Sequence, residues 1–205
     1  TGNAGITFVD TTDGATIWGY YDGIYAKNSG DGALSITTTG TIKSGQDNGI
    51  GATNDGTSLT INAATTSGGF YGAGIDAKNS GDGALSITTT GTTTGSNGYS
   101  GIEANNSSAG TSLTIVTGKF DDEGNLIKSV DTTGGSGINA ENSGTGALSI
   151  TTTGTTTGNL FDGINAKIYN DNSASDLTID AATTTGGQSG IYANNRGSGT
   201  LSITA

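Results

Sequence analysis

Residues 74–91, GIDAKNSGDGALSITTTG, carry the pattern that decides the fold. Two short segments alternate apolar and polar residues: Ile75-Asp76-Ala77 and, ten residues further on, Leu85-Ser86-Ile87. Alternation with a period of two predicts short strands with one buried face. Gly and Asn separate the two segments, as they do at turns. The spacing of an amphipathic helix does not occur.

This pattern repeats along the chain. A Gly-Ile pair returns at spacings of 26, 25, 27, 36, 26 and 27 residues, and Gly5-Ile6 begins a shorter first copy. In the full copies, the Ile residues are Ile24, Ile50, Ile75, Ile102, Ile138, Ile164 and Ile191. An Ala stands two positions after each of them, and an Asn stands four positions after all but one, where Ile168 takes its place. Leu-x-Ile follows in every copy, which indicates one structural unit per repeat.

A unit of this length with few large apolar side chains cannot bury a core alone, whereas stacked units share a continuous one. Two short strands per unit, with a third expected in Thr-rich segments such as 88–94, predict an all-β parallel β-helix, also called a β-solenoid. We expect about eight coils of roughly 26 residues each. The Ile, Ala, Leu and Ile of each coil should point inward.

Two rows of polar residues are also expected inside the stack. Asn residues at the same turn of successive coils can bond along the stack as a ladder, and Asn tolerates a left-handed backbone at such a turn. Thr38, Thr89 and Thr152 alternate with Ala63 and Ala181 at an inward position. Their buried hydroxyls should then bond along the stack.

Composition excludes several classes of chemistry. Gly contributes 38 residues, hydrophobic residues only 31%, and His, Cys, Pro and Met are absent. Disulfides, Cys/His zinc sites and any His base or Cys nucleophile are therefore excluded. Seven basic residues scattered through a chain of net charge −11 disfavour nucleic acid. No apolar run approaches a membrane span, and we expect no cofactor.

The repeat GIxAxNSGxGALSITTTGT, with its GTSLTI variants, resembles the passenger regions of bacterial autotransporters (type V secretion) over nearly the whole chain. The resemblance implies a right-handed β-helix, exported to the bacterial cell surface or released, and commonly an adhesin or a toxin. On this basis we expect residues 1–205 to form a single β-helix segment of a longer chain. Its function would be structural and binding, similar to that of an adhesin, at an extracellular location.

Aromatic residues before several Gly-Ile pairs are the best candidates for a binding surface. Corresponding loops of a solenoid stack along one edge, so these side chains should form a stripe that binds a glycan or a cell-surface protein. The competing interpretation is that they cover the edge of the core and pack on one another. The candidate partner-binding residues are Trp18, Tyr20, Tyr21, Phe70, Tyr71, Tyr99 and Phe161.

Residues 118–131, GKFDDEGNLIKSVD, account for the one long spacing. Apolar residues on both sides of Asp122-Glu123-Gly124-Asn125 predict a β-hairpin that stands off the rod. Asp121, Asp122 and Glu123 provide oxygen ligands of the kind that Ca²⁺ prefers. Their spacing does not match a calcium loop, so no metal site is predicted.

The sequence is also compatible with three other functions. Outward Ser and Thr on the Leu-x-Ile strands are typical of flat ice-binding faces, but Asn62, Val116 and Asp180 interrupt the array. Polysaccharide-degrading enzymes use β-helices, yet the acids are dispersed, and Asp31 and Asp82 occupy equivalent repeat turns; no enzyme is predicted. The principal alternative is a self-assembling extracellular filament or matrix protein, joined end to end through open strand edges.

Overall fold

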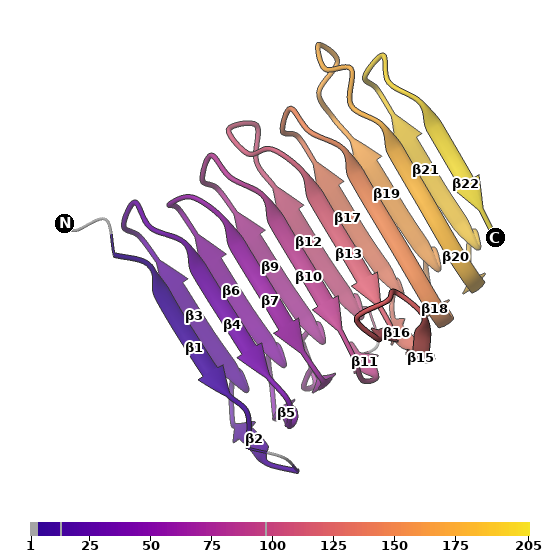
Figure 1. The fold of residues 1–205 in the computed structure, drawn as a ribbon. Coiled ribbons are helices and arrows are strands. Elements are labelled where there is room, and N and C mark those ends of the chain that lie inside the picture. The colour runs from indigo at the N-terminus through magenta and orange to yellow at the C-terminus, as the bar shows by residue number, and fades with distance from the viewer. Residues whose placement is uncertain (1–3, 13, 97) are drawn as a thin grey trace.

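The computed structural model describes residues 4–12, 14–96 and 98–205. They form a parallel β-solenoid of about 7 turns with ~27 residues per turn, stacked from the N-terminal to the C-terminal end (Figure 1). The described residues contain no helix, and hence none with the length and apolar character needed to cross a membrane. The predicted all-β parallel β-helix is confirmed.

The Gly-Ile-x-Ala segments form sheet B, in which all strands are parallel. Its strands are β3 (Ile24–Asn28), β6 (Ile50–Asn54), β9 (Ile75–Asn79), β12 (Ile102–Asn106), β17 (Ile138–Asn142), β19 (Ile164–Ile168) and β21 (Ile191–Asn195). The register places Ile on Ile and Ala on Ala throughout; Ile75, for example, pairs with Ile50 and Ile102. One residue type per column follows directly from the repeat.

The Leu-x-Ile segments form the first row of sheet A, and the Thr-rich segments form its second row. The first row contains β1 (Ile6–Asp10), β4 (Leu34–Thr38), β7 (Leu59–Ala63), β10 (Leu85–Thr89), β13 (Leu113–Thr117), β18 (Leu148–Gly158), β20 (Leu177–Gly186) and β22 (Leu201–Thr204). The second row contains β2 (Thr16–Gly19), β5 (Thr41–Ser44), β8 (Thr65–Ser67), β11 (Thr93–Thr94) and β16 (Thr132–Gly134), and it continues in the later parts of β18 and β20. The third strand is therefore also confirmed.

The number of turns is about 7, not the eight expected. The first copy, at Gly5-Ile6, was expected to be a Gly-Ile strand, but Ile6 pairs with Leu34 and Phe8 with Ile36. Ile6-x-Phe8 has the same apolar alternation as Leu-x-Ile, so β1 takes that place in sheet A. Sheet B therefore begins only at β3.

The core is a set of columns running along the rod. Leu85, Ile87, Ile75 and Ala77 of one turn are fully buried, and their counterparts above and below them are buried as well. Burial of each Ile or Leu contributes about 1.5–3 kcal/mol. The Ala column is buried from Ala52 to Ala166, so a larger side chain there would overpack the core.

The Asn residues at the ends of the sheet B strands form the predicted ladder. Asn54 Nδ2 donates to Asn79 Oδ1 at 2.9 Å, and Asn79 Nδ2 donates to Asn106 Oδ1 at 3.0 Å. Each Nδ2 also donates to a carbonyl of its own turn, as Asn79 does to Gly83 O at 3.0 Å. The ladder runs from Asn28 to Asn142. The ladder ends at Asn142, because the next position of the column is the buried Ile168, which has no side-chain amide.

Two details of the predicted polar rows are wrong. No described residue other than Gly has a positive φ, so the ladder Asn residues do not use a left-handed backbone. The buried hydroxyls of Thr38, Thr89 and Thr152 find no hydrogen-bond partner among the described residues. Alanines provide no acceptor on one side, as at Thr89 opposite Ala63, and adjoining Thr hydroxyls do not bond one another.

The insertion at 118–131 stands off the rod as an antiparallel pair, β14 (Lys119–Phe120) and β15 (Leu126–Lys128), seen in dark red in Figure 1. Asp121 closes its turn, because its carboxylate accepts bonds from the backbone N and Nδ2 of Asn125 at 2.7 and 3.0 Å. Thr153 Oγ1 anchors the base by donating to Thr117 O at 2.8 Å. The hairpin is therefore fixed at its root and exposed at its tip.

Candidate functional site

The aromatic candidates lie at the turn that leads from the second row of sheet A into sheet B, except Trp18, which lies on β2 itself. All are exposed, from 43% for Tyr99 and Phe161 to 71% for Phe70. A cover that seals the edge of the core would bury most of each ring. These rings therefore do not serve mainly as a cover, although some of them contact one another.

Backbone hydrogen bonds stack these turns directly on one another. Tyr71 N donates to Gln46 O at 2.7 Å, and Asp47 N donates to Tyr21 O at 3.2 Å. The rings form two edge-to-face pairs, Tyr20 with Tyr21 at 5.1 Å and Phe70 with Tyr71 at 4.9 Å between centroids. A turn without aromatic residues separates the two pairs. The expected stripe is thus a series of separate clusters.

Two adjoining hollows meet at Tyr71. The first, of about 220 Å³, lies between Tyr25 and Tyr71, and the second, of about 280 Å³, lies between Tyr71 and Tyr99. Tyr71, Asn48 and Asp76 line both of them. We call these two hollows together the paired hollow. Trp18, Tyr20, Tyr21, Phe70 and Phe161 line neither of them.

The floor of the paired hollow is one outward column of sheet B. Along it the register places Tyr25, Gly51, Asp76 and Glu103 in successive turns. Gly51 is the one residue of these four without a side chain, which opens a notch beside Asp76. A Cβ added at Gly51 would lie 3.2 Å from Asp22 Oδ1 and 3.5 Å from the Tyr25 ring. The notch therefore has an acidic wall and an aromatic wall.

Asn48 holds three successive turns of the wall in place. Its backbone N donates to Asp22 Oδ1 at 3.1 Å, and its side-chain Oδ1 accepts from Ala73 N at 3.0 Å. The first bond orients the Asp22 carboxylate toward the notch, and the second fixes the loop that carries Tyr71. Asn48 is thus a positioning residue, and its amide is also available at the surface of both hollows.

Electrostatics in the paired hollow are dominated by carboxylates. Burial raises the pKa of Asp76, with a further increase from Asp22 and an opposing effect of Lys78. Burial also raises the pKa of Glu103, against the hydrogen bonds from Ser100 Oγ at 2.8 Å and Asn139 Nδ2 at 2.7 Å. Each negative charge is therefore less favourable here than in water. A ligand that donates hydrogen bonds would stabilise these carboxylates.

This arrangement matches the chemistry of carbohydrate recognition. Tyrosine rings offer flat apolar faces with a polar end, and carboxylate and amide oxygens accept bonds from hydroxyl groups. A shallow site with few fixed polar groups orients a small ligand. Of the predicted residues, only Tyr71 and Tyr99 line the paired hollow, and Tyr25 lies beside them.

Sequence reasoning missed the polar half of the site. Asp22, Asn48, Asp76, Glu103 and Tyr25 are not among the residues that the sequence predicts for a site. A positional signal was present, because Asp22 and Asn48 both stand directly before a Gly-Ile pair and Asp76 and Glu103 both follow the Ile of such a pair. Their convergence depends on the register between turns, which the structure supplies.

The hydroxyl face of sheet A has one continuous column. Ser35, Thr60, Ser86, Thr114 and Ser149 pair in succession. The neighbouring column contains Asn62, Val116 and Asp180 among its Thr residues, as predicted. A flat array two columns wide is therefore interrupted at every second turn.

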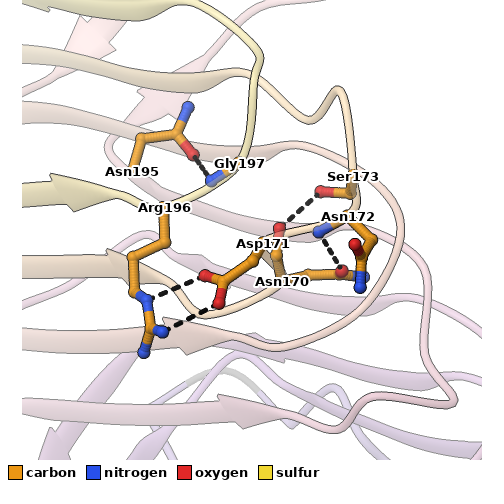
Figure 2. A network of polar contacts seen from close by, with 7 residues as sticks. All are labelled: Asn170, Asp171, Asn172, Ser173, Asn195, Arg196 and Gly197. Atoms are coloured by element: carbon orange, nitrogen blue, oxygen red, sulfur yellow. Dashed lines mark hydrogen bonds and ion pairs between the residues drawn. The ribbon is translucent and has the colours of Figure 1, made fainter.

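Polar contacts near the C-terminal end hold one turn against the next (Figure 2). Arg196 forms two contacts of 2.8 Å with Asp171, from Nε to Oδ1 and from Nη2 to Oδ2. Gly197 N donates to Asn195 Oδ1 at 3.0 Å within the same turn. The guanidinium of Arg196 is therefore already paired with the carboxylate of Asp171.

No group of three or more Asp, Glu, His or Cys residues in the described ranges is placed to hold a metal ion, the Asp121–Glu123 segment included. Asp31 and Asp82, singled out in the repeat turns, line another hollow of about 380 Å³ together with Asp55. That hollow has no aromatic wall. Comparisons of the chain with protein-family models, with curated proteins and with solved structures gave no match.

Proposed function

We propose that this chain is a binding segment of a surface-displayed or secreted adhesin-like protein, and that it binds glycans through the paired hollow. The observation that carries the proposal is Tyr71, an exposed ring shared by two hollows whose walls are carboxylates and an amide. The solenoid provides a stiff rod on which such a site is presented. The resemblance of the sequence repeat to autotransporter passengers supports an extracellular location.

Rigidity of the site also supports binding. The loops that carry Tyr71 and Tyr99 are tied to adjacent turns by backbone bonds, including Gly135 N to Tyr99 O at 2.6 Å. A preformed site loses little conformational entropy when a ligand binds. Tyrosine adds to this advantage, because its ring is large and has few rotatable bonds.

A glycan array probed with wild-type chain and with Tyr71→Ala tests this proposal. Loss of the shared ring should weaken binding of a selected glycan by about 1–2 kcal/mol, or roughly five- to thirtyfold. Tyr21→Ala is the matched control, because Tyr21 is also exposed but lines neither hollow. Equal losses in both variants, or binding to no glycan at all, would contradict the proposal.

End-to-end association into filaments stays a prediction from the sequence. Electron microscopy of the purified chain tests it separately, because regular fibres would support assembly and short rods would not. Neither outcome decides whether the paired hollow binds a glycan.

A further inference from the structure

The paired hollow also indicates the chemical class of its glycan. We infer that it binds amino-sugar glycans with free primary ammonium groups, which lie between the tyrosine rings and the carboxylates. This inference rests on the proposed glycan-binding function and makes it more specific.

Charge is the first observation. Asp22, Asp47, Asp76 and Glu103 line the paired hollow, and Lys78 is the only cationic residue in its lining. An acidic glycan would be repelled, and a neutral one would leave most of this charge uncompensated. A ligand carrying one positive charge per sugar complements it.

The bonding state of the carboxylates is the second observation. Among the described residues, neither the Asp76 nor the Asp47 carboxylate accepts a hydrogen bond or forms an ion pair, and Lys78 is within ion-pair distance of neither. Asp76 is nevertheless half-buried in the floor, next to the Gly51 notch. An ammonium group donates three hydrogen bonds and bears a full charge, so it can bond Asp76 and a neighbouring carboxylate together.

The third observation is an intramolecular example on the same face of sheet B. Lys167 Nζ lies 6.0 Å from the ring centroid of Tyr169, 5.9 Å from that of Tyr192 and 3.5 Å from Glu141 Oε1. Tyr192 belongs to the same outward column as Tyr25 and Asp76. This face thus already holds an ammonium group between tyrosine rings and a carboxylate, where the ring quadrupole adds to the ionic attraction.

The repeat favours a polymeric glycan over an isolated lysine of a partner protein. The two hollows belong to neighbouring turns, about 4.8 Å apart along the stack, and they share the Tyr71 wall. A glycan with an amino group on each sugar can place successive groups in both hollows and gain avidity. Flat sugar rings can then lie against the tyrosines.

Calorimetry on the full 205-residue chain tests the inference. The probes are a glucosamine oligosaccharide and its fully N-acetylated form of the same length, which differ only in charge and acetyl group. Wild-type chain should bind the glucosamine form at least tenfold more tightly, and this preference should shrink as the salt concentration rises. The double variant Asp76→Asn, Glu103→Gln keeps the shape and should bring the preference close to one. Asp82→Asn, in a loop that lines a different hollow, should leave the preference unchanged.

The outcomes separate this inference from the proposed function. Equal binding of both oligosaccharides, abolished by Tyr71→Ala, would overturn the ammonium assignment and leave glycan binding intact. Tighter binding of a lysine-rich peptide than of the glucosamine form would overturn the glycan and point to a protein partner. Binding of neither probe, while the array identifies other glycans, would also overturn the inference. Circular dichroism and melting curves establish that each variant is folded.

Discussion

At the scale of single residues, the ladder of asparagines places the strictest requirement on how the turns are aligned. Each buried amide is satisfied only when the turns above and below it are in register, as at Asn79 between Asn54 and Asn106. An error of one residue at one turn would leave several buried polar groups unpaired, each costing about 1–3 kcal/mol. The ladder therefore fixes the register of the stack as well as stabilising it.

Asn79→Ala removes the central link of this ladder. It removes the Oδ1 acceptor of Asn54 Nδ2 and the Nδ2 donor to Asn106 Oδ1 and Gly83 O. The free energy of unfolding should therefore fall by about 1–3 kcal/mol. Asn62→Ala on the exposed face of β7 is the control and should change it by less than about 0.5 kcal/mol. Urea denaturation measures both, and similar values for the two variants would show that the ladder adds no stability.

Asp76 lowers the stability of the fold at the site proposed to bind a glycan. Because burial raises its pKa above the ordinary 3.8, the folded state binds its proton more tightly than the unfolded state does. Stability is therefore lost as the pH rises from 3.8 through the raised pKa, and the loss persists at neutral pH. Such a cost is expected at a binding site rather than in a purely structural strand.

Asp76→Asn should accordingly raise the melting temperature at pH 7, and the gain should vanish when the pH falls below about 3, where the carboxyl is protonated in both states. Asp82→Asn removes a carboxylate that lies outside the paired hollow and controls for net charge. A melting temperature that is unchanged or lower at pH 7, with the Asp82→Asn control unaffected, would show that the Asp76 charge does not oppose folding.

At the scale of the strands, the Ala column of sheet B sets the width of the core. Ala77, Ala104 and Ala140 are fully buried, and each lies between two others of its kind. The repeat predicted this column correctly, because each Ala has a fixed place after its Ile. It did not predict that the first copy would join sheet A, because Ile6-x-Phe8 fits either pattern and only the pairing with Leu34 decides between them.

Ala77→Leu should force the two sheets apart locally and lower the free energy of unfolding by about 1–3 kcal/mol. Lys78→Leu introduces the same side chain one position further along β9, on the outward face, and should change stability by no more than about 0.5 kcal/mol. Thermal melts compare the two. A larger loss in Lys78→Leu than in Ala77→Leu would reverse the assignment of faces in β9.

Only the aromatic half of the candidate site could be predicted from the sequence, because the polar half depends on how the strands pair. Tyr71 and Tyr99 stand out as large aromatic residues in loops, whereas Asp22 and Asn48 are common turn residues that also occur where no site exists. Their role depends on Asn48 bonding both the preceding and the following turn. The notch at Gly51 is likewise visible only when the columns are placed in register.

At the scale of the whole molecule, the repeats are nearly identical inside and varied outside. The buried columns that start at Ile24 and Ala26 keep one residue type from turn to turn, while the outward column through Gly51 changes at almost every turn, from Tyr25 to Tyr192. The core columns thus hold a constant scaffold, and the side chains that differ are free to make a local surface. The paired hollow is one such surface, and the hairpin at 118–131 is another.

We propose that the rod binds a glycan at this local surface, between Tyr25 and Tyr99. A crystal structure of the chain with a glycan selected on the array tests it most directly. We expect a saccharide in the paired hollow, with one sugar against the Tyr71 ring and its polar groups on Asp76, Glu103 or Asn48. A saccharide bound instead along the hydroxyl face of sheet A, or at the hairpin, would contradict it.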